Sequence, residues 1–106
     1  MSKTYRLKAV FKDWSKRVDP KVFYTQKDAR RYAIRMMDAM KNIRYFEMSN
    51  PDFADIWQVT SSINRTDDGK GFYWSALKPY AGWYRGSGHY INADGSISKK
   101  EYIHYW

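Results

Sequence analysis

Cysteine is absent from the 106 residues of this chain. Disulfides, thiolate zinc sites, iron–sulfur clusters and cysteine nucleophiles are therefore excluded, and packing alone has to hold the core. Long apolar runs are also absent. None approaches the roughly 20 residues that cross a bilayer, and residues 1–10 carry charges where a signal peptide has its apolar segment. We expect a soluble, cytoplasmic protein without membrane contact.

Proline and glycine are scarce, with three and six residues, and no segment rich in them divides the chain. A second core of useful size does not fit into this length. Hydrophobic residues make up 43% of the chain and aromatic residues 19%, which is too apolar for a chain that stays unfolded. These features predict a single folded domain over residues 1–106.

Acidic residues are few, because 11 Asp and Glu stand against 19 Lys and Arg and leave a net charge of +8. Residues 1–50 hold 13 basic and 5 acidic side chains, whereas residues 51–106 hold 6 of each, so the first half carries the whole excess. Aromatic residues lean the other way, with 12 of the 20 in residues 51–106. This balance favours a polyanionic partner and indicates two chemically different faces of one domain.

The first 24 residues predict a basic β-hairpin. Residues 5–11 alternate with the period of two that is typical of a half-buried strand, and their solvent side is largely basic. Residues 13–20 form a polar loop, and residues 22–24 are a short run suited to a second strand. The cations of this hairpin are Arg6, Lys8, Lys12, Lys16 and Arg17.

A helix is predicted from Gln26 to Lys41. Thr25 can cap it by accepting from the backbone N–H near Asp28, whose carboxylate suits the positive first turn. Six apolar side chains recur at helical spacing and should face the sheet. They are Ala29, Tyr32, Ala33, Met36, Met37 and Met40. On the other side we expect an exposed basic ridge of Lys27, Arg31 and Arg35, flanked by Arg30 and Lys41.

The second half predicts further strands. Residues 43–48, 55–63 and 72–77 have the β-branched and aromatic composition of strands, and the turn-forming residues 64–71 join the last two as a hairpin. The glycine-punctuated aromatic residues 78–88 predict an ordered surface loop.

The C-terminal tail is ambiguous. Residues 92–95 form an Asn-Ala-Asp-Gly turn, after which Ser98 and Glu101 match a capping box that would open a short helix, while residues 102–106 fit a strand equally well. We predict the helical turn, with the strand as the alternative. The fold class is then α+β, with an antiparallel sheet of about five strands packed on one long helix in the order β-β-α-β-β-β.

The segment Asn92–Glu101 resembles the second part of an EF-hand calcium loop. Gly95 takes the glycine position, Asp94 the fifth ligand position and Glu101 the twelfth. The first position falls on Tyr90, which has no carboxylate. An Asp-Gly turn followed by a capped helix produces most of this match without a metal, so we expect no metal site and no cofactor.

Catalytic signatures are missing. The sequence contains no Walker A motif, no nucleophile elbow, no HExxH motif and no histidine cluster. His89 could act as a base, but a lone histidine beside a glycine is more often a loop residue. Asp67 and Asp68 fit a turn better than a metal site. We predict that the protein is not an enzyme, and a small hydrolase using His89 is the least favoured hypothesis.

The segment Tyr5–Met40, a basic hairpin that leads into a capped helix, is similar to the arm-type DNA-binding domains of phage integrases. That resemblance implies a three-stranded sheet that enters the major groove, with one helix packed behind it. Here only two strands are evident before the helix, and three follow it.

The combined pattern predicts a non-catalytic binding module for nucleic acid or a nucleoprotein complex, because cations contact phosphates and flat rings stack on unpaired bases. The alternative is an inhibitor or adaptor of phage or mobile-element type that contacts a host protein. In a competing structural interpretation, the rings are core and the cations solvate the surface. The candidate binding residues are Lys8, Lys12, Trp14, Lys16, Arg17, Lys27, Arg30, Arg31, Arg35, Trp83, Tyr84 and Arg85.

Overall fold

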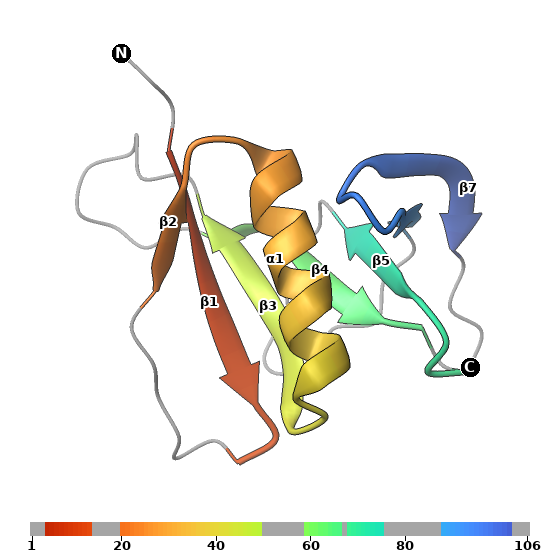
Figure 1. Ribbon diagram of the computed structural model, residues 1–106, viewed down its shortest axis with the longest axis horizontal. Coiled ribbons are helices and arrows are strands. Elements are labelled where there is room, and N and C mark those ends of the chain that lie inside the picture. The colour runs from red at the N-terminus through yellow and green to blue at the C-terminus, as the bar shows by residue number, and fades with distance from the viewer. Residues whose placement is uncertain (1–3, 14–19, 50–58, 67, 76–87, 103–106) are drawn as a thin grey trace.

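A computed structural model describes residues 4–13, 20–49, 59–66, 68–75 and 88–102 of the chain. One α-helix lies across one face of a seven-stranded antiparallel sheet (Figure 1). The sheet order is β2-β1-β3-β4-β5-β6-β7, so β2 and β7 occupy its two edges. The elements are β1 (Tyr5–Phe11), β2 (Lys21–Phe23), α1 (Gln26–Ala39), β3 (Ile43–Ser49), β4 (Val59–Arg65), β5 (Phe72–Ser75), β6 (Gly88–Ile91) and β7 (Ile97–Tyr102).

The predicted α+β class is confirmed, but the sheet has seven strands where about five were expected. Strands β1, β2, β3 and β5 begin within one residue of the predicted positions, and β4 runs on to Arg65, two residues beyond its predicted end. Residues 55–58 and 76–77 of the predicted strands lie outside the described residues. The extra strands are β6, in a region with no predicted strand, and β7. The integrase-type arrangement of three strands is therefore replaced by a much wider sheet. The loops predicted over residues 13–20 and 78–88 lie outside the described residues except at their ends, where Gly88 begins strand β6 and is not part of a loop.

The predicted C-terminal helical turn is wrong, because residues 97–102 form strand β7. Ser98 does accept from the backbone N–H of Lys100, at 3.1 Å, but within an extended strand. Tyr102 at the end of β7 is buried, stacks on Tyr73 with ring centroids 4.3 Å apart and meets Tyr90 edge-on. Burial of this ring outweighs a local capping preference, because aromatic packing contributes more than one cap.

Helix α1 begins as predicted. Thr25 has extended backbone angles, and its hydroxyl accepts from the backbone N–H of Asp28 at 3.1 Å. The helix ends at Ala39, two residues before the predicted end. Its C-terminal carbonyls are bonded by a distant strand, because the Arg65 guanidinium donates to the carbonyl oxygens of Met37 at 2.7 Å and Met40 at 3.0 Å. A cation at this end also opposes the partial negative charge of the helix terminus.

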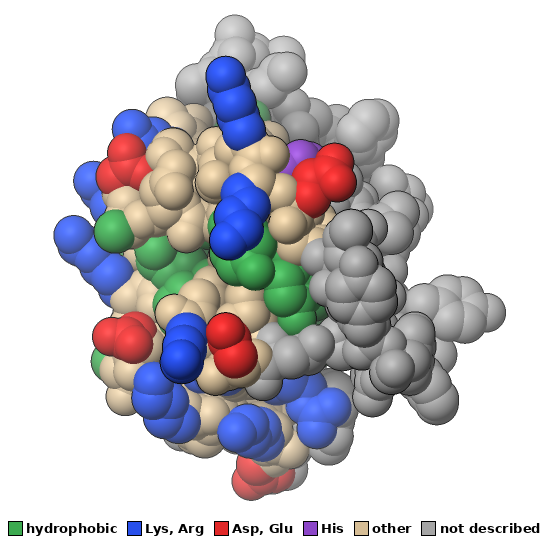
Figure 2. Space-filling view, turned by 90° about the vertical axis from the view of Figure 1, so that its right-hand side faces the viewer, with side chains coloured by type: hydrophobic (Ala, Val, Ile, Leu, Met, Phe, Trp, Pro, Cys, Tyr) green, Lys and Arg blue, Asp and Glu red, His purple; other side chains and the backbone are tan. Residues whose placement is uncertain are grey.

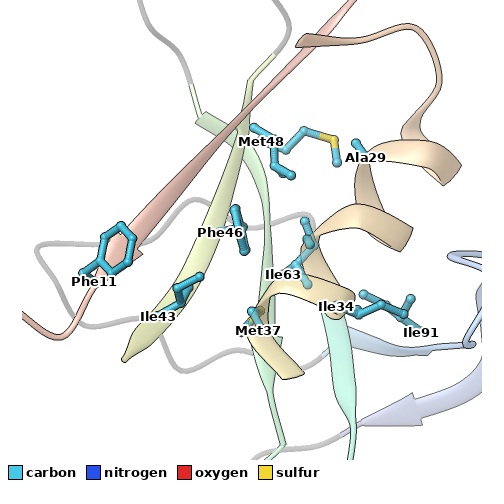
Figure 3. Close-up of a cluster of buried hydrophobic side chains, with 11 residues drawn as sticks. Phe11, Ala29, Ile34, Met37, Ile43, Phe46, Met48, Ile63 and Ile91 are labelled. Atoms are coloured by element: carbon cyan, nitrogen blue, oxygen red, sulfur yellow. The ribbon is translucent and has the colours of Figure 1, made fainter. Parts of the chain in front are cut away.

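The core lies between α1 and the helix-facing side of the central strands (Figure 3). The register places Ala9, Phe46 and Ile63 side by side across β1, β3 and β4 on that side. From the helix, Ala33 and Met37 are fully buried in the same cluster. The buried cluster consists of Leu7, Phe11, Ala29, Ala33, Ile34, Met37, Ile43, Phe46, Met48, Ile63 and Ile91.

One helix is too narrow to cover this sheet. Seven strands at a spacing of about 4.8 Å span roughly 29 Å between the outer two, whereas a helix with its side chains is about 10–12 Å wide. Helix α1 packs against β2, β1, β3 and β4, so the part of the sheet formed by β5, β6 and β7 has to be closed in another way (Figure 1). On the β6–β7 side, the turn between these strands reaches the helix, and Gly95 is buried against it.

Gly95 and Gly69 provide a matched pair that tests this contact. Both have positive φ, +91° and +71°, which costs an alanine roughly 1–2 kcal/mol. Only at Gly95 would a Cβ also collide with the helix, against the carbonyl oxygen of Lys27 and within 2.9 Å of the backbone nitrogen of Arg31. We expect Gly95→Ala to lower the free energy of unfolding by about 2 kcal/mol more than Gly69→Ala in urea titrations. Equal losses would contradict this close packing.

Candidate binding surface between strand β2 and the helix

The predicted basic ridge exists on α1, but most of its charges have partners. Lys27, Arg31 and Arg35 are all exposed at a spacing of four residues. Lys27 forms an ion pair with Asp94 at 3.5 Å, and Arg31 forms one with Asp28 at 3.2 Å. Arg35 takes part in none of the ion pairs within the described ranges. Figure 2 likewise shows acidic side chains interspersed among the lysines and arginines of one face.

Arg30 does not belong to the exposed ridge, which corrects its predicted place there. The residue is only 8% exposed, and its Nε donates to the carbonyl oxygen of Gly95 at 2.7 Å. A second nitrogen donates to the Gln26 side chain at 3.2 Å. Burial lowers the pKa of this guanidinium from its ordinary value. Arg30 therefore joins the helix to the β6–β7 hairpin rather than presenting a charge to a partner.

The two strand cations of the prediction lie elsewhere. Lys8 pairs in register with Glu47 of β3, on the side of the sheet that faces away from the helix. Lys12 follows the end of β1 and is exposed, and its backbone N–H donates to the carbonyl oxygen of Asn42 at 2.8 Å. Lys8 and the helix ridge therefore lie on opposite sides of the sheet. The predicted basic hairpin and the predicted basic ridge therefore do not form one continuous cationic surface among the described residues.

The remaining predicted binding residues cannot be placed. They lie outside the described ranges of the chain and are Trp14, Lys16, Arg17, Trp83, Tyr84 and Arg85.

A compact group of cations and rings does occur between β2 and α1. Phe23 and Tyr32 are half-buried, with ring centroids 5.2 Å apart. The Nζ of Lys21 lies 4.3 Å from the centroid of the Tyr32 ring. Arg31 and Arg35 line a shallow depression of about 310 Å³ together with both rings and Asp28. We call Lys21, Phe23, Arg31, Tyr32 and Arg35 the β2–α1 surface.

Three of these five residues escaped the prediction. Lys21 and Phe23 alternate in the second strand, so they share its helix-facing side with Tyr5 and Leu7 of β1. Tyr32 was assigned to the core stripe, which it joins only in part. The alternation of residues 21–23 was a usable signal, but it identifies a face of the strand and not the helix residues opposite. The β2–α1 surface carries three cations and, with Asp28 beside it, one carboxylate.

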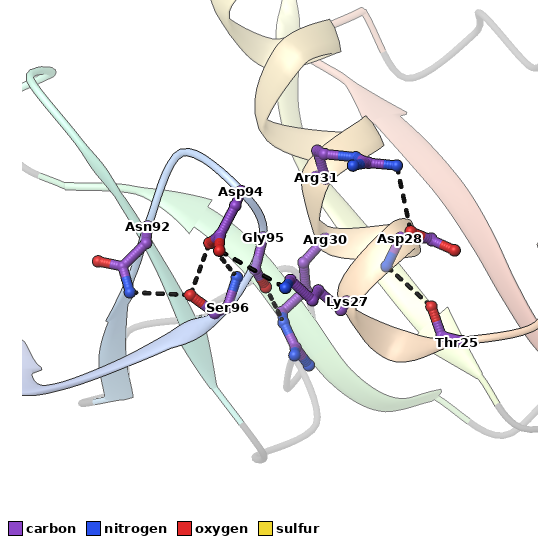
Figure 4. A network of polar contacts seen from close by, with 9 residues as sticks. All are labelled: Thr25, Lys27, Asp28, Arg30, Arg31, Asn92, Asp94, Gly95 and Ser96. Carbon is purple, nitrogen blue, oxygen red and sulfur yellow. Dashed lines mark hydrogen bonds and ion pairs between the residues drawn. The ribbon is translucent and has the colours of Figure 1, made fainter.

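The EF-hand-like segment is a β-hairpin turn (Figure 4). Asp94 accepts from the backbone N–H of Ser96 at 2.9 Å and from its hydroxyl at 2.6 Å, and Asn92 donates to the same hydroxyl at 3.0 Å. Glu101 lies on β7, in register with His89 of β6, and is not part of the turn. The side-chain oxygens accept hydrogen bonds within the turn, as Asp and Ser often do in turns. The similarity to a calcium loop comes from this turn chemistry.

The described residues that were considered for catalysis lie in a strand and in a turn. His89 lies on β6 between Trp74 and Glu101, so its predicted place in a loop is wrong. Asp68 is a turn residue as predicted, because its carboxylate accepts from the Thr66 hydroxyl at 2.5 Å and from the backbone N–H of Lys70 at 3.0 Å. The Thr66 hydrogen bond is the main cause of a lowered pKa of Asp68.

Within the described ranges, no three His, Asp or Glu side chains gather as metal ligands would. In the same part of the chain, α1 is the one helix, and it is neither long nor apolar enough to span a membrane. Comparisons of the chain with protein-family models, with curated proteins and with solved structures found no match.

Acid should weaken the contact between the hairpin and the helix through Asp94. Hydrogen bonds from Ser96, followed by the charge of Lys27, lower the pKa of Asp94 from 3.8 to about 2. The folded state therefore binds this proton less readily than the unfolded state, so the stabilisation is complete above the ordinary pKa of 3.8 and is lost as pH falls towards 2.

We expect the free energy of unfolding of the wild type to fall more steeply between pH 3.8 and about pH 2 than the free energy of unfolding of Asp94→Asn. Urea titration at each pH measures both. Glu101→Gln, which removes an exposed carboxylate of the same hairpin, controls for the loss of charge. Parallel profiles for the wild type and Asp94→Asn would contradict the assignment.

Proposed function

We propose that the protein is a non-catalytic binding module that contacts single-stranded nucleic acid through the β2–α1 surface. The observation that carries this proposal is the gathering of three cations, from β2 and α1, around two half-buried rings. The excess of positive charge in residues 1–50 supports the same class of partner. A nucleoprotein complex would contact the same surface through its nucleic acid.

The cations suit phosphate binding. Arg35 is exposed and takes part in none of the ion pairs described, and Lys21 is exposed beside the Tyr32 ring. Arg31 shares Asp28 in an exposed pair, which contributes little to stability and can exchange for a phosphate. Binding at such positions releases counterions from the nucleic acid, and this release supplies sequence-independent affinity.

The rings suit unpaired bases. Phe23 and Tyr32 line the depression and are only partly buried, so each keeps part of its ring surface accessible beside the cations. Every base has a flat face, and stacking on an aromatic side chain contributes roughly 1–3 kcal/mol per base. Paired bases are stacked within a duplex and cannot use these rings. The combination therefore favours a single strand over a duplex.

Salt dependence tests this function. We expect a fluorescein-labelled oligothymidylate to bind at about 50 mM salt and to lose affinity steeply towards about 200 mM, as measured by fluorescence anisotropy. The double variant Lys21→Gln/Arg35→Gln should bind more weakly and reduce the slope of log affinity against log salt by roughly 1.4, which is about 0.7 for each phosphate contact.

The matched control is Lys99→Gln/Lys100→Gln, which removes the same charge from exposed positions of β7 at the opposite edge of the sheet. It should retain nearly the wild-type slope. No binding at the lower salt concentration, or equal losses for the two double variants, would contradict the proposal.

A second candidate function is that of an adaptor or inhibitor that contacts a host protein, and edge strand β2 favours it. Val22 is 49% exposed and Tyr24 72% exposed, which makes them the large hydrophobic side chains most open to solvent among the described residues. An edge strand offers backbone groups to an added strand, and exposed apolar side chains beside it supply specificity. Val22 pairs with Arg6 on the side away from the helix, so this contact would use a different face from the β2–α1 surface.

Nuclease treatment separates the two functions. For an adaptor, a tagged copy of the chain should retain the same protein partner from a nuclease-treated cell lysate, and Val22→Asp/Tyr24→Asp should lose it because the apolar edge is gone. The Lys99→Gln/Lys100→Gln variant should keep the partner. A partner that disappears with the nucleic acid would contradict direct protein binding.

A further inference from the structure

An apolar cavity of about 430 Å³ lies between the helix, β1 and the start of β2. This volume is within the range of roughly 300–1,000 Å³ that is typical of small-molecule sites. Its floor is formed by β1 and β3 and its roof by the second half of α1. Figure 3 shows Phe11, Ile43 and Phe46 of the floor on two neighbouring strands beside the helix. The lining residues are Leu7, Ala9, Phe11, Pro20, Lys21, Tyr32, Met36, Met40, Ile43 and Phe46.

The cavity opens where the short strand β2 leaves the underside of the helix incompletely covered. On the β6–β7 side a hairpin turn packs against the helix and fills the corresponding space at Gly95. On the β2 side the strand has only three residues, two of them exposed, so it adds little apolar cover to β1. Apolar surface that lines such a concavity has lost packing partners on one side, so an apolar occupant would restore contacts that the chain itself does not make.

The described lining of the cavity carries charge of one sign. Among these lining residues Lys21 is the single cation, and none of them has a carboxylate. The Lys21 ammonium is exposed and rests 4.3 Å from the centroid of the Tyr32 ring, at the boundary between the cavity and solvent. An apolar body inside the cavity would therefore place an anionic group of the same molecule next to this ammonium.

The lining also suits an adaptable fit. Met36 and Met40 form part of the roof and are only partly buried. Unbranched methionine side chains can change rotamer to match different apolar shapes. Beneath them, Ile43 and Phe46 are almost fully buried and provide a rigid floor.

We propose that this cavity is a binding site for a small amphipathic anion, with the apolar body held between Ala9 and Met36 and the anionic group paired with Lys21. This site overlaps the β2–α1 surface at its rim, but most of its lining lies beneath the helix and outside that surface. Lys21 and Tyr32 are the residues that both share.

Two fluorescent probes of similar shape test the site. Anilinonaphthalene sulfonate carries an anionic group on an apolar body, and N-phenylnaphthylamine is its uncharged analogue. We expect the wild-type protein to bind both, with a rise in fluorescence on transfer into an apolar site. Lys21→Gln should weaken the binding of the anionic probe about fivefold, as the loss of one partly exposed ion pair would, and should leave the affinity for the uncharged probe unchanged.

Filling the cavity should remove both probes. Ala9→Phe fills the cavity from the floor, and Met36→Phe fills it from the roof. Circular dichroism shows whether each variant folds. If one variant does not fold, probe binding to the other tests the proposal. Lys100→Gln, at the far edge of the sheet, is the charge control and should bind both probes as the wild type does. Undiminished binding of both probes to the folded filled variants, or equal effects of Lys21→Gln on the two probes, would overturn the proposal.

Discussion

The mismatch between one narrow helix and a wide sheet is the constraint on which the other features of this structure depend. Seven strands span roughly 29 Å, and a helix covers about 10–12 Å of that width. The helix packs against β2, β1, β3 and β4, and most of the buried strand residues lie on β1, β3 and β4. The two ends of the sheet differ in what packs beside the helix. A hairpin turn reaches the helix beside β6 and β7, whereas the short strand β2 leaves an apolar cavity and two half-buried rings on the opposite side.

The same division explains how the basic residues of the helix are used. On the hairpin side, Arg30 donates to the Gly95 carbonyl and Lys27 pairs with Asp94, so these charges stabilise the contact between the helix and the hairpin. On the β2 side, Arg31 and Arg35 border a depression with Phe23 and Tyr32. Lys27 and Arg30 therefore serve a structural contact, whereas Arg31 and Arg35 border the surface that supports the proposed binding of phosphates.

Particular residues show which features of the structure could be predicted from the sequence. The helix start was predictable, because the Thr25 cap and the apolar stripe depend on neighbours within a few residues. Burial of Arg30 also had a signal, since it precedes Ala33, Ile34 and Met37 at the spacings of the buried face. Strand β6 had little signal, because a glycine-rich aromatic segment precedes it. At Gly88 a side chain would collide with the Trp74 backbone, so the glycine that indicated a loop instead permits close strand packing.

By itself, the sequence determined the helix and its cap, the first five strands, the turn at Asp68 and the exclusion of cysteine chemistry, because these depend on composition or on hydrogen bonds between near neighbours. Tertiary structure decided the strand identity of residues 97–102, the Arg65 bonds at the helix end, and the grouping of Lys21 with Tyr32. Each of these contacts joins different secondary-structure elements. Local propensity is worth only a fraction of the free energy released when a ring is buried or a helix end is bonded, so distant packing prevails where the two conflict.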